Sequence, residues 1–286
     1  MREFSPCGQL ERDLTKRFRK TIWHPFVRAV KTYELISPGD SIAVCISGGK
    51  DSMLLAKLMQ MLHRHSDFPF GLEFIVMDPG YLPENRQRII DNAAFLEIPI
   101  RIFETNIFNT VVDIKSSPCY LCARMRRGHL YSYARSLGCN KIALGHHFND
   151  VIETMLMSML YGSQIQGMPP KLHSTNFEGM QLIRPLYEVH EDAIIAWRDY
   201  NGFRFLQCAC RFTERANDEI ALSKRLETKR LIAELKKNNP QVEDNIFRSM
   251  SNVCLDTLCE YKQGGVRHSF LERFRTGEQP TDGNKN

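Results

Sequence analysis

The 286-residue sequence predicts an α/β fold built on a parallel sheet, with helical extensions at both ends. Short apolar runs alternate with stretches of helical periodicity, which is the pattern of strands joined by crossover helices. A helical leader precedes them, with Leu10, Leu14, Phe18 and Ile22 on one apolar stripe. Apolar residues make up 43% and charged residues 25%, as is typical of a globular protein with a substantial core.

The expected elements follow one another after a Ser-Pro-Gly-Asp turn at 37–40 that closes the leader. Strands are expected at 42–46, 72–77, 100–103 and 141–144, with helices between or after them near 52–65, 84–96, 120–137 and 149–161. Because the strands and helices alternate, the strands are expected to run parallel within one sheet.

The remaining sequence predicts a small hairpin and a helical end. Residues 171–175 and 180–183 read as its two strands, with a turn between them. Beyond about residue 190 the pattern is mostly helical, and the last dozen residues have the composition of a disordered tail. We therefore divide the chain into a leader (1–37), a central sheet domain (38–200) and a C-terminal region (201–286).

Composition narrows the class of protein. No stretch approaches the roughly 20 apolar residues of a membrane helix, and the charged N-terminus does not resemble a secretory signal. We therefore expect a cytoplasmic protein that does not contact a membrane. The net charge is only +5, but basic residues gather at 11–31, 124–135 and 211–230. Such clusters suit a polyanion such as RNA, and they are equally typical of solvated helix faces.

A glycine-rich turn, Ser47-Gly48-Gly49-Lys50-Asp51-Ser52, follows the first apolar strand and leads into a helix. Backbone N–H groups and a helix N-terminus then point to one place, which suits a phosphate. Lys50 adds positive charge, and Asp51 offers the carboxylate oxygens that Mg²⁺ prefers. The spacing is neither that of a Walker A loop nor that of a dinucleotide fold. The residues alone predict a nucleotide site here.

Two other strand ends carry polar residues that are expected beside this loop. Met77 and Asp78 end the second strand, where Asp78 either approaches a ribose or metal or serves the turn at Pro79-Gly80. The segment Gly145-His146-His147-Phe148-Asn149-Asp150 ends the fourth strand. There Asn149 or Asp150 either caps the next helix or, in the case of Asp150, takes part in the chemistry.

Nine cysteines include two clusters, Cys119 with Cys122 and Cys208 with Cys210. In a reducing compartment such clusters indicate metal binding or redox chemistry rather than structural disulfides. Cys-x-x-Cys alone fits a zinc site, a redox disulfide and an iron–sulfur cluster. The other five are expected to be buried small residues: Cys7, Cys45, Cys139, Cys254 and Cys259.

Together, three motifs resemble the tRNA 2-thiocytidine synthetase family of PP-loop, N-type ATP pyrophosphatase enzymes. They are the loop at 47–52, the Gly-His-x-x-x-Asp segment at 145–150, and Pro-Cys-Tyr-Leu-Cys-Ala-Arg-Met-Arg-Arg-Gly at 118–128. The resemblance covers about residues 20 to 215. It implies an adenine nucleotide alpha hydrolase-like domain with this loop as its pyrophosphate-binding element.

The resemblance also implies roles for individual residues. ATP would contact the residues Ser47, Gly48, Gly49, Lys50, Asp51, Ser52, Met77, Asp78, Gly145 and His146, with magnesium on Asp51. Lys50, Asp51 and Asp150 would assist catalysis. Cys119, Cys122 and Cys208 would hold a 4Fe–4S cluster with one open iron. The family usually has Cys-x-x-Cys where this chain has Cys208-Ala209-Cys210, so Cys210 is an alternate ligand.

The implied activity is ATP-dependent thiolation of tRNA. The C2 oxygen of a pyrimidine would be adenylated and replaced by sulfur, giving 2-thiocytidine in the anticodon loop. Implied partners are tRNA and a sulfur donor, either a cysteine desulfurase or sulfide, and a homodimer is a further expectation. Two alternatives stay open: a PP-loop thiolase for another base or a small molecule, and a zinc-stabilised ATP-dependent amidase or ligase using all four clustered cysteines.

Overall fold

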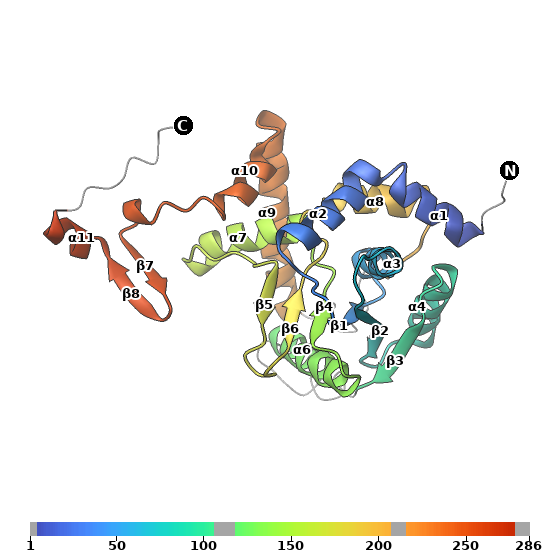
Figure 1. Cartoon of the computed structure of the whole chain (residues 1–286). Coiled ribbons are helices and arrows are strands. Elements are labelled where there is room, and N and C mark those ends of the chain that lie inside the picture. The colour runs from blue at the N-terminus through green and yellow to red at the C-terminus, as the bar shows by residue number, and fades with distance from the viewer. Residues whose placement is uncertain (1–4, 106–117, 207–215, 278–286) are drawn as a thin grey trace. The chain divides into compact units, whose positions relative to one another are not determined.

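A six-stranded sheet with the order β3-β2-β1-β4-β6-β5 lies at the centre of the fold (Figure 1). Its strands are β1 (Ser41–Ile46), β2 (Gly71–Asp78), β3 (Ile100–Glu104), β4 (Lys141–Ala143), β5 (Lys171–His173) and β6 (Gln181–Ile183). All neighbouring pairs are parallel except β5 with β6, which form the expected hairpin. The predicted α/β class is confirmed.

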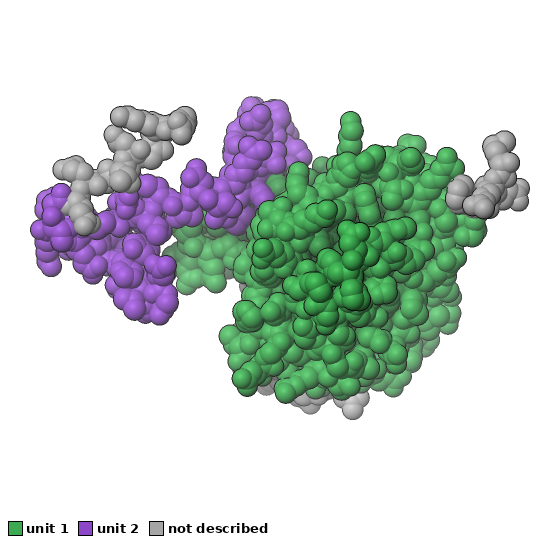
Figure 2. All heavy atoms as spheres, viewed as in Figure 1, with its two compact units in different colours: residues 1–233 green, residues 234–286 purple. Residues whose placement is uncertain are grey.

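The structure is a computed structural model that describes residues 5–105, 118–206 and 216–277. The chain forms two compact units, residues 1–233 and residues 234–286 (Figure 2). The sheet and the candidate site belong to the first unit. The three-region division made from the sequence stays a prediction, and residues 278–286 of the expected disordered tail lie outside the described residues.

Helices cover both faces of the sheet (Figure 1). One face packs against the helices α1 (Pro6–Thr15), η1 (Arg19–Trp23), α2 (His24–Thr32), α3 (Lys50–Arg64), α4 (Pro83–Phe95) and α8 (Glu191–Tyr200). The other packs against α6 (Pro118–Ser136). Successive strand residues alternate between the two cores: Val44 joins the first, and Ala43 and Cys45 the second. The leader stripe from Leu10 to Ile22 is buried, as predicted.

The remaining elements are α7 (Phe148–Gly162), α9 (Ala216–Asn238), α10 (Val242–Ser249), η2 (Leu255–Thr257), β7 (Glu260–Gln263), β8 (Val266–Ser269) and α11 (Phe270–Thr276). The described part of the chain beyond residue 190 is mostly helical, as expected, but the β7–β8 hairpin was not expected. Gly264 and Gly265 have φ values of 58° and 83°, which a two-residue hairpin turn requires and which glycine adopts without strain. None of the helices in the described ranges could cross a bilayer.

One expectation about burial is wrong in part. Cys7, Cys45 and Cys139 are buried as expected, but Cys254 and Cys259 are exposed because they lie in the second unit, whose described segments bury little apolar surface. On α7, Met155 belongs to the core, whereas Met159 and Leu160 are 46% and 53% exposed. The apolar periodicity of α7 therefore continues past the buried part of the helix.

The order of the strands places the site. From β1 the chain moves outward through β2 to β3, and it then returns to the other side of β1 as β4. The direction of winding therefore reverses between β1 and β4, and such a switch leaves a crevice at the carboxyl ends of the two strands. Ser47 follows β1 and Leu144 follows β4, so the loops that carry the sequence motifs begin at this crevice.

Candidate active site

The loop after β1 is shaped by its own hydrogen bonds. The backbone N–H of Ser47 donates to the Ser52 hydroxyl over 3.1 Å, and that hydroxyl donates to the Gly49 carbonyl over 3.0 Å. Helix α3 begins at Lys50 with Gly49 as its N-cap, so the first N–H groups of the helix face the loop. The serine expected to donate to a ligand thus also fixes the turn that presents these N–H groups.

Gly48 is required by two features of this turn. Its φ of +84° lies in the left-handed region, and a Cβ atom there would come within 2.7 Å of the Ile89 side chain and 2.9 Å of the Leu206 side chain. Gly145, after β4, is needed for close approach, because its Cβ would lie 3.1 Å from the backbone of Asp51 and Ser52. The two motif loops are therefore in direct backbone contact.

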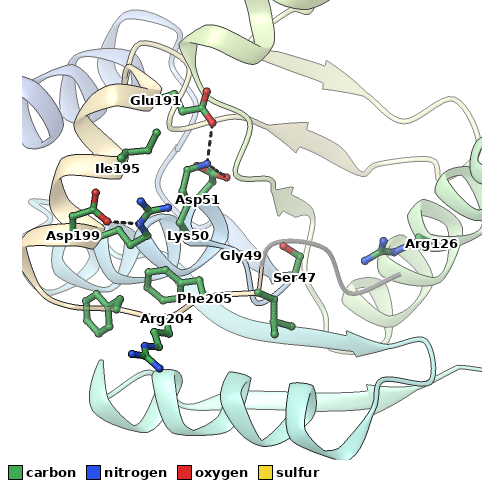
Figure 3. Close-up of a pocket in the computed structure, with 13 residues that line it drawn as sticks. Ser47, Gly49, Lys50, Asp51, Arg126, Glu191, Ile195, Asp199, Arg204 and Phe205 are labelled. Atoms are coloured by element: carbon green, nitrogen blue, oxygen red, sulfur yellow. Dashed lines mark hydrogen bonds and ion pairs between the residues drawn. The ribbon is translucent and has the colours of Figure 1, made fainter. Parts of the chain in front are cut away.

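The loop opens onto a cavity of about 780 Å³, here called the loop cavity. Ser47, Gly49, Lys50 and Asp51 form one side, and α8 and Arg126 contribute the others (Figure 3). Apolar surface comes from Ile195, Phe203, Phe205 and Leu206. A cavity of this size, lined by phosphate-type donors, charged side chains and apolar side chains, has the dimensions and chemistry of a nucleotide site.

A second cavity, the central cavity, has a volume of about 390 Å³ and lies at the ends of three strands. Its lining includes most of the residues predicted from those strand ends: Ser47, Asp51, Ser52, Met77, Gly145, His146 and Asp150. Arg126 lines both cavities, and Ser47 and Asp51 are common to both as well. The predicted loop and strand-end residues therefore line one or both of these cavities, with the exceptions of Gly48 and Asp78.

Asp78 serves the turn. Its Oδ1 accepts hydrogen bonds from the backbone N–H groups of Gly80 and Tyr81, at 2.9 and 2.7 Å, and its side chain is buried. Arg86 lies 3.6 Å from the other carboxylate oxygen. Of the two uses weighed for Asp78, the turn is the one seen in the structure, and contact with a ribose or metal stays a prediction.

Lys50 is held by two carboxylates (Figure 3). Its Nζ lies 3.1 Å from Asp51 Oδ1 and 3.1 Å from Glu191 Oε1. Burial raises the pKa of Glu191, but hydrogen bonds and charge from Lys229 and Lys50 outweigh it and hold the pKa at about 2. Asp51 Oδ1 is buried and, within the described residues, accepts no hydrogen bond: its contact with Lys50 is an ion pair, and Lys50 donates a hydrogen bond to Oδ2 over 3.2 Å.

Helix α9 closes a network of charges over α7. Arg225 donates to Asp150 and to Glu153, each over 2.7 Å, and Lys229 lies 2.9 Å from Glu191 and 3.6 Å from Glu153. Burial tends to raise the pKa of Asp150, yet His147 and Arg225 hold it below its usual range. Asp150 therefore carries a negative charge at neutral pH.

Helix α7 has His147 as its N-cap, and of the two residues expected to cap it Asp150 takes part in the cap and Asn149 does not. The His147 side chain accepts from the Asp150 backbone N–H, and the Asp150 carboxylate accepts from the His147 backbone N–H over 3.0 Å. Asn149 instead accepts from the backbone N–H of Glu191. Asp150 thus completes a capping box and also lines the central cavity.

His146 is a buried, neutral histidine at the same strand end. Burial lowers its pKa to about 4, helped by the positive charges of Arg184 and Arg225 and opposed by Asp150. Its Nδ1 is buried without a hydrogen-bond partner in the described residues. A neutral imidazole with an unpaired nitrogen in a cavity can donate or accept a single hydrogen bond from a ligand.

Segments next to the cysteine motifs contact the loop and its cavities. Cys119 and Cys122 fall within the first turns of α6, and four residues further on Arg126 lines both cavities. Cys208 and Cys210 lie outside the described residues, but the backbone N–H of Leu206 donates to the Gly48 carbonyl over 3.0 Å. Among the described residues, no group of three or more histidine, cysteine or acidic side chains is arranged to hold a metal ion.

Sequence reasoning missed several residues of the site. Glu191 at the start of α8 reads as an ordinary acidic residue in a first helical turn. Phe203 and Phe205 carry no local signal of a role in a site, yet both line the loop cavity. Arg225 and Lys229 stood out as part of a basic stretch, but nothing local to them indicates that they bind Glu153.

Comparison with known proteins places this geometry in a family context. The family model described as a PP-loop domain matches residues 16–213. A tRNA-cytidine(32) 2-sulfurtransferase of Coxiella burnetii (strain RSA 493 / Nine Mile phase I) is 35% identical over 258 residues, covering 88% of this chain and 97% of the relative. One from Geobacter sulfurreducens (strain ATCC 51573 / DSM 12127 / PCA) is 35% identical over 238 residues, covering 82% and 90%.

A solved structure agrees with the fold. The U34-tRNA thiolase NcsA from Methanococcus maripaludis, determined with its [4Fe-4S] cluster, aligns with a TM-score of 0.64 at 21% sequence identity. The alignment covers 83% of this chain and 80% of that one. At this level of identity, the likeness supports the arrangement of the sheet and helices.

Proposed function

This chain belongs to the PP-loop domain family, and we propose that it is an ATP-dependent tRNA sulfurtransferase that uses an iron–sulfur cluster. The finer proposal is that it adenylates the C2 oxygen of a cytidine in the anticodon loop and replaces that oxygen with sulfur. The relatives of Coxiella and Geobacter, named for cytidine 32 of tRNA, support this base and position.

One observation carries the proposal: segments next to both cysteine motifs meet at the loop after β1. Leu206, two residues before Cys208, hydrogen-bonds to Gly48, and Arg126, four residues after Cys122, lines the same cavity as Lys50 and Asp51. A nucleotide site beside a cysteine-rich site would suit a reaction in which ATP activates an atom and sulfur replaces it, and these two contacts support that arrangement.

The residues present fit ATP with magnesium. Lys50, the loop N–H groups and the N-terminus of α3 would hold the phosphates. Asp51 Oδ1, which is buried and accepts no hydrogen bond in the described residues, would exchange its ion pair with Lys50 for Mg²⁺, bound together with phosphate oxygens. The apolar lining from Ile195, Phe203 and Phe205 would receive the adenine.

The chain's own residues would then support adenylation. As the α-phosphate is attacked, negative charge moves onto the departing pyrophosphate, where Lys50 and the helix N-terminus stabilise it. His146, neutral and unpaired, would donate one hydrogen bond to a phosphate or base oxygen in the central cavity. Asp150 would keep its charge beside the metal or accept a proton from the base.

The helix position of two cysteines also fits a cluster. Cys119 and Cys122 are three residues apart in the first turns of α6, and a helix N-terminus favours thiolate charge. Bound by these and Cys208 or Cys210, a 4Fe–4S cluster would supply an iron able to carry sulfide to the activated carbon. The choice between Cys208 and Cys210 stays a prediction.

Three further predictions accompany this function. The sulfur donor is expected to be a cysteine desulfurase or free sulfide, the enzyme is expected to act in the cytoplasm, and it is expected to form a homodimer. Because the C2 atom lies on the edge of a base, the target cytidine must be unpaired or turned out of its stack to reach the central cavity.

Metal content and activity of one matched pair of variants test the proposal. Protein purified without oxygen should contain about four irons per chain, as a 4Fe–4S cluster requires. Cys119→Ser should lose both iron and thiolation, whereas the control Cys254→Ser, an exposed cysteine of the second unit, should keep both. Stoichiometric zinc without iron, or full thiolation by Cys119→Ser, would overturn the mechanism.

A further inference from the structure

A third cavity, of about 600 Å³, lies beside the central one and is lined by three arginines. Arg127 comes from α6, Arg184 follows β6, and Arg225 comes from α9. We call it the arginine cavity. Its other polar side chains are the hydroxyls of Thr154 and Ser158 and the amide of Gln166, and no carboxylate is among the described residues that line it. The lining therefore offers hydrogen-bond donors and positive charge.

Arg184 is the unusual member of this lining. The residue is only 7% exposed, and its Nε is buried without a hydrogen-bond partner in the described part of the chain. One of its terminal nitrogens donates to the Pro169 carbonyl, which fixes the guanidinium at the edge of the cavity. A buried guanidinium whose N–H has no acceptor destabilises the fold unless an anion accepts that hydrogen bond, because arginine stays charged at neutral pH.

The electrostatics agree with that geometry. Burial lowers the pKa of Arg184 to about 10, Tyr187 opposes the change, and the nearby charge of Arg127 adds to it. Arg225 is partly neutralised by Asp150 and Glu153, whereas the ion pairs recorded for the described residues include none for Arg127 or Arg184. Two of the three positive charges thus remain for a ligand.

The location of the cavity indicates which anion it serves. Arg127 lines both the arginine cavity and the central cavity, and Ser47 and Asp51 line both the central cavity and the loop cavity. The three cavities therefore form a series, with the nucleotide loop at one end and the arginines at the other. A polymer whose reacting base enters the central cavity would place its adjacent backbone within reach of the arginines.

We propose that the arginine cavity binds a backbone phosphodiester of the RNA substrate, next to the nucleotide whose base enters the central cavity. This inference rests on the proposed function, because it needs an RNA substrate. Arg184 and Arg127 are then positioning residues that hold the RNA backbone while the base is modified. The same phosphate oxygens also occur in the polyphosphate of ATP, and binding measurements separate these two sources.

The test compares two arginines on one helix. Arg127→Gln removes a cavity charge, and Arg135→Gln removes an exposed charge of α6 that lines none of the three cavities. With the cluster-containing protein and an unmodified tRNA transcript, Arg127→Gln should raise the Kd about tenfold, since a hydrogen bond from a charged donor is lost. The slope of log Kd against log salt concentration should become smaller, by the contribution of about one phosphate contact. Arg135→Gln should bind as the wild type does.

A second variant and measurements with ATP and pyrophosphate distinguish the possible outcomes. Arg184→Gln should weaken tRNA binding at least as much as Arg127→Gln does. If a lowered melting temperature shows that Arg184→Gln is unfolded, the tRNA affinity of Arg127→Gln alone decides whether the arginine cavity binds RNA. Weaker binding of ATP or inorganic pyrophosphate, with tRNA affinity unchanged, would assign the cavity to the nucleotide and overturn the RNA site. If the wild type binds and thiolates tRNA while Arg127→Gln matches Arg135→Gln, only this inference fails. A wild type that binds no tRNA overturns the proposed function and this site together.

Discussion

The two walls of the candidate site are built differently. The wall at the ends of β1 and β4 is made from backbone: Gly48 in a left-handed conformation, Gly145 in close contact with Asp51, and the first turn of α3. The wall contributed by α8 and α9 is made from side-chain charges, with Glu191, Arg225 and Lys229 bound to residues of the other wall and of α7. The first fixes where a phosphate would bind, and the second sets the charge around it.

This difference predicts different responses to substitution. No other residue can restore the backbone conformation of the first wall, so a substitution there should abolish function. Charges are shared among several partners, so a change in the second wall should be smaller and should depend on pH or salt.

The largest effect is expected from Gly48→Ala. The new Cβ would require φ +84° of an alanine and would lie 2.7 Å from the Ile89 side chain, which distorts the loop. The kcat/KM for ATP in thiolation should fall at least about 100-fold, a loss of the size seen when preorganised donors move.

A matched glycine separates strain from loss of the site. Gly39→Ala imposes a similar φ, +81°, with nothing within 4 Å of its Cβ. It should cost about 1 kcal/mol of unfolding free energy and leave the kinetics unchanged. Wild-type activity in Gly48→Ala would show that the first wall tolerates substitution and would end the contrast between the walls.

His146 should give stability a pH dependence. Its pKa is about 4 in the folded protein, because of burial and neighbouring arginines, and about 6.5 in an unfolded chain. As pH falls from 6.5 to 4, only the unfolded chain takes up the proton, so the free energy of unfolding should fall by about 2–3 kcal/mol. His146→Asn should lack this decline in urea unfolding. An equal decline in the variant would assign it to another group.

Glu153→Gln probes the charge network. The Glu153 side chain is 2% exposed and accepts a hydrogen bond from Arg225. The side chains of Arg225 and Lys229 are 42% and 40% exposed, so water would partly solvate their charges if Glu153 lost its own. Unfolding free energy should fall by about 1–2 kcal/mol. The control Glu234→Gln, in an exposed pair with Lys237, should change it by less than about 0.5 kcal/mol. Equal losses of unfolding free energy in the two variants would mean that the burial of Glu153 does not strengthen its ion pairs.

The smallest effect is expected from Glu191→Gln. This carboxylate, whose pKa is about 2, is charged at neutral pH and competes with phosphate for Lys50. Its neutral amide should tighten ATP binding about threefold at low ionic strength, and the gain should shrink with added salt. Calorimetric titration with ATP at several salt concentrations measures the gain in affinity and its decrease with salt. Weaker ATP binding would mean that Glu191 positions Lys50 rather than competing for it.

The first wall was predictable from sequence because it depends on neighbours in the chain. An apolar strand, a Gly-Gly-Lys-Asp-Ser turn and a helix start are all local, and parallel topology then brings Gly145 to the same edge. The α/β class and the positions of the sheet strands followed from the same local patterns.

The second wall was not predictable because its partners are far apart in sequence. Lys50 and Glu191 are separated by 141 residues, and Asp150 and Arg225 by 75. Nothing local distinguishes such charges from a solvated helix face. The β7–β8 hairpin was missed for another reason, since its Gly264-Gly265 turn was a readable signal that helical periodicity obscured.

The most direct test of the central claim is reconstituted thiolation. Cluster-containing protein, ATP, Mg²⁺, sulfide and unmodified tRNA should yield 2-thiocytidine, identified by mass spectrometry of the digested nucleosides. Each thiolated base should be accompanied by one AMP and one pyrophosphate. ATP cleavage without any thionucleoside, or thiolation that needs no ATP, would contradict the account.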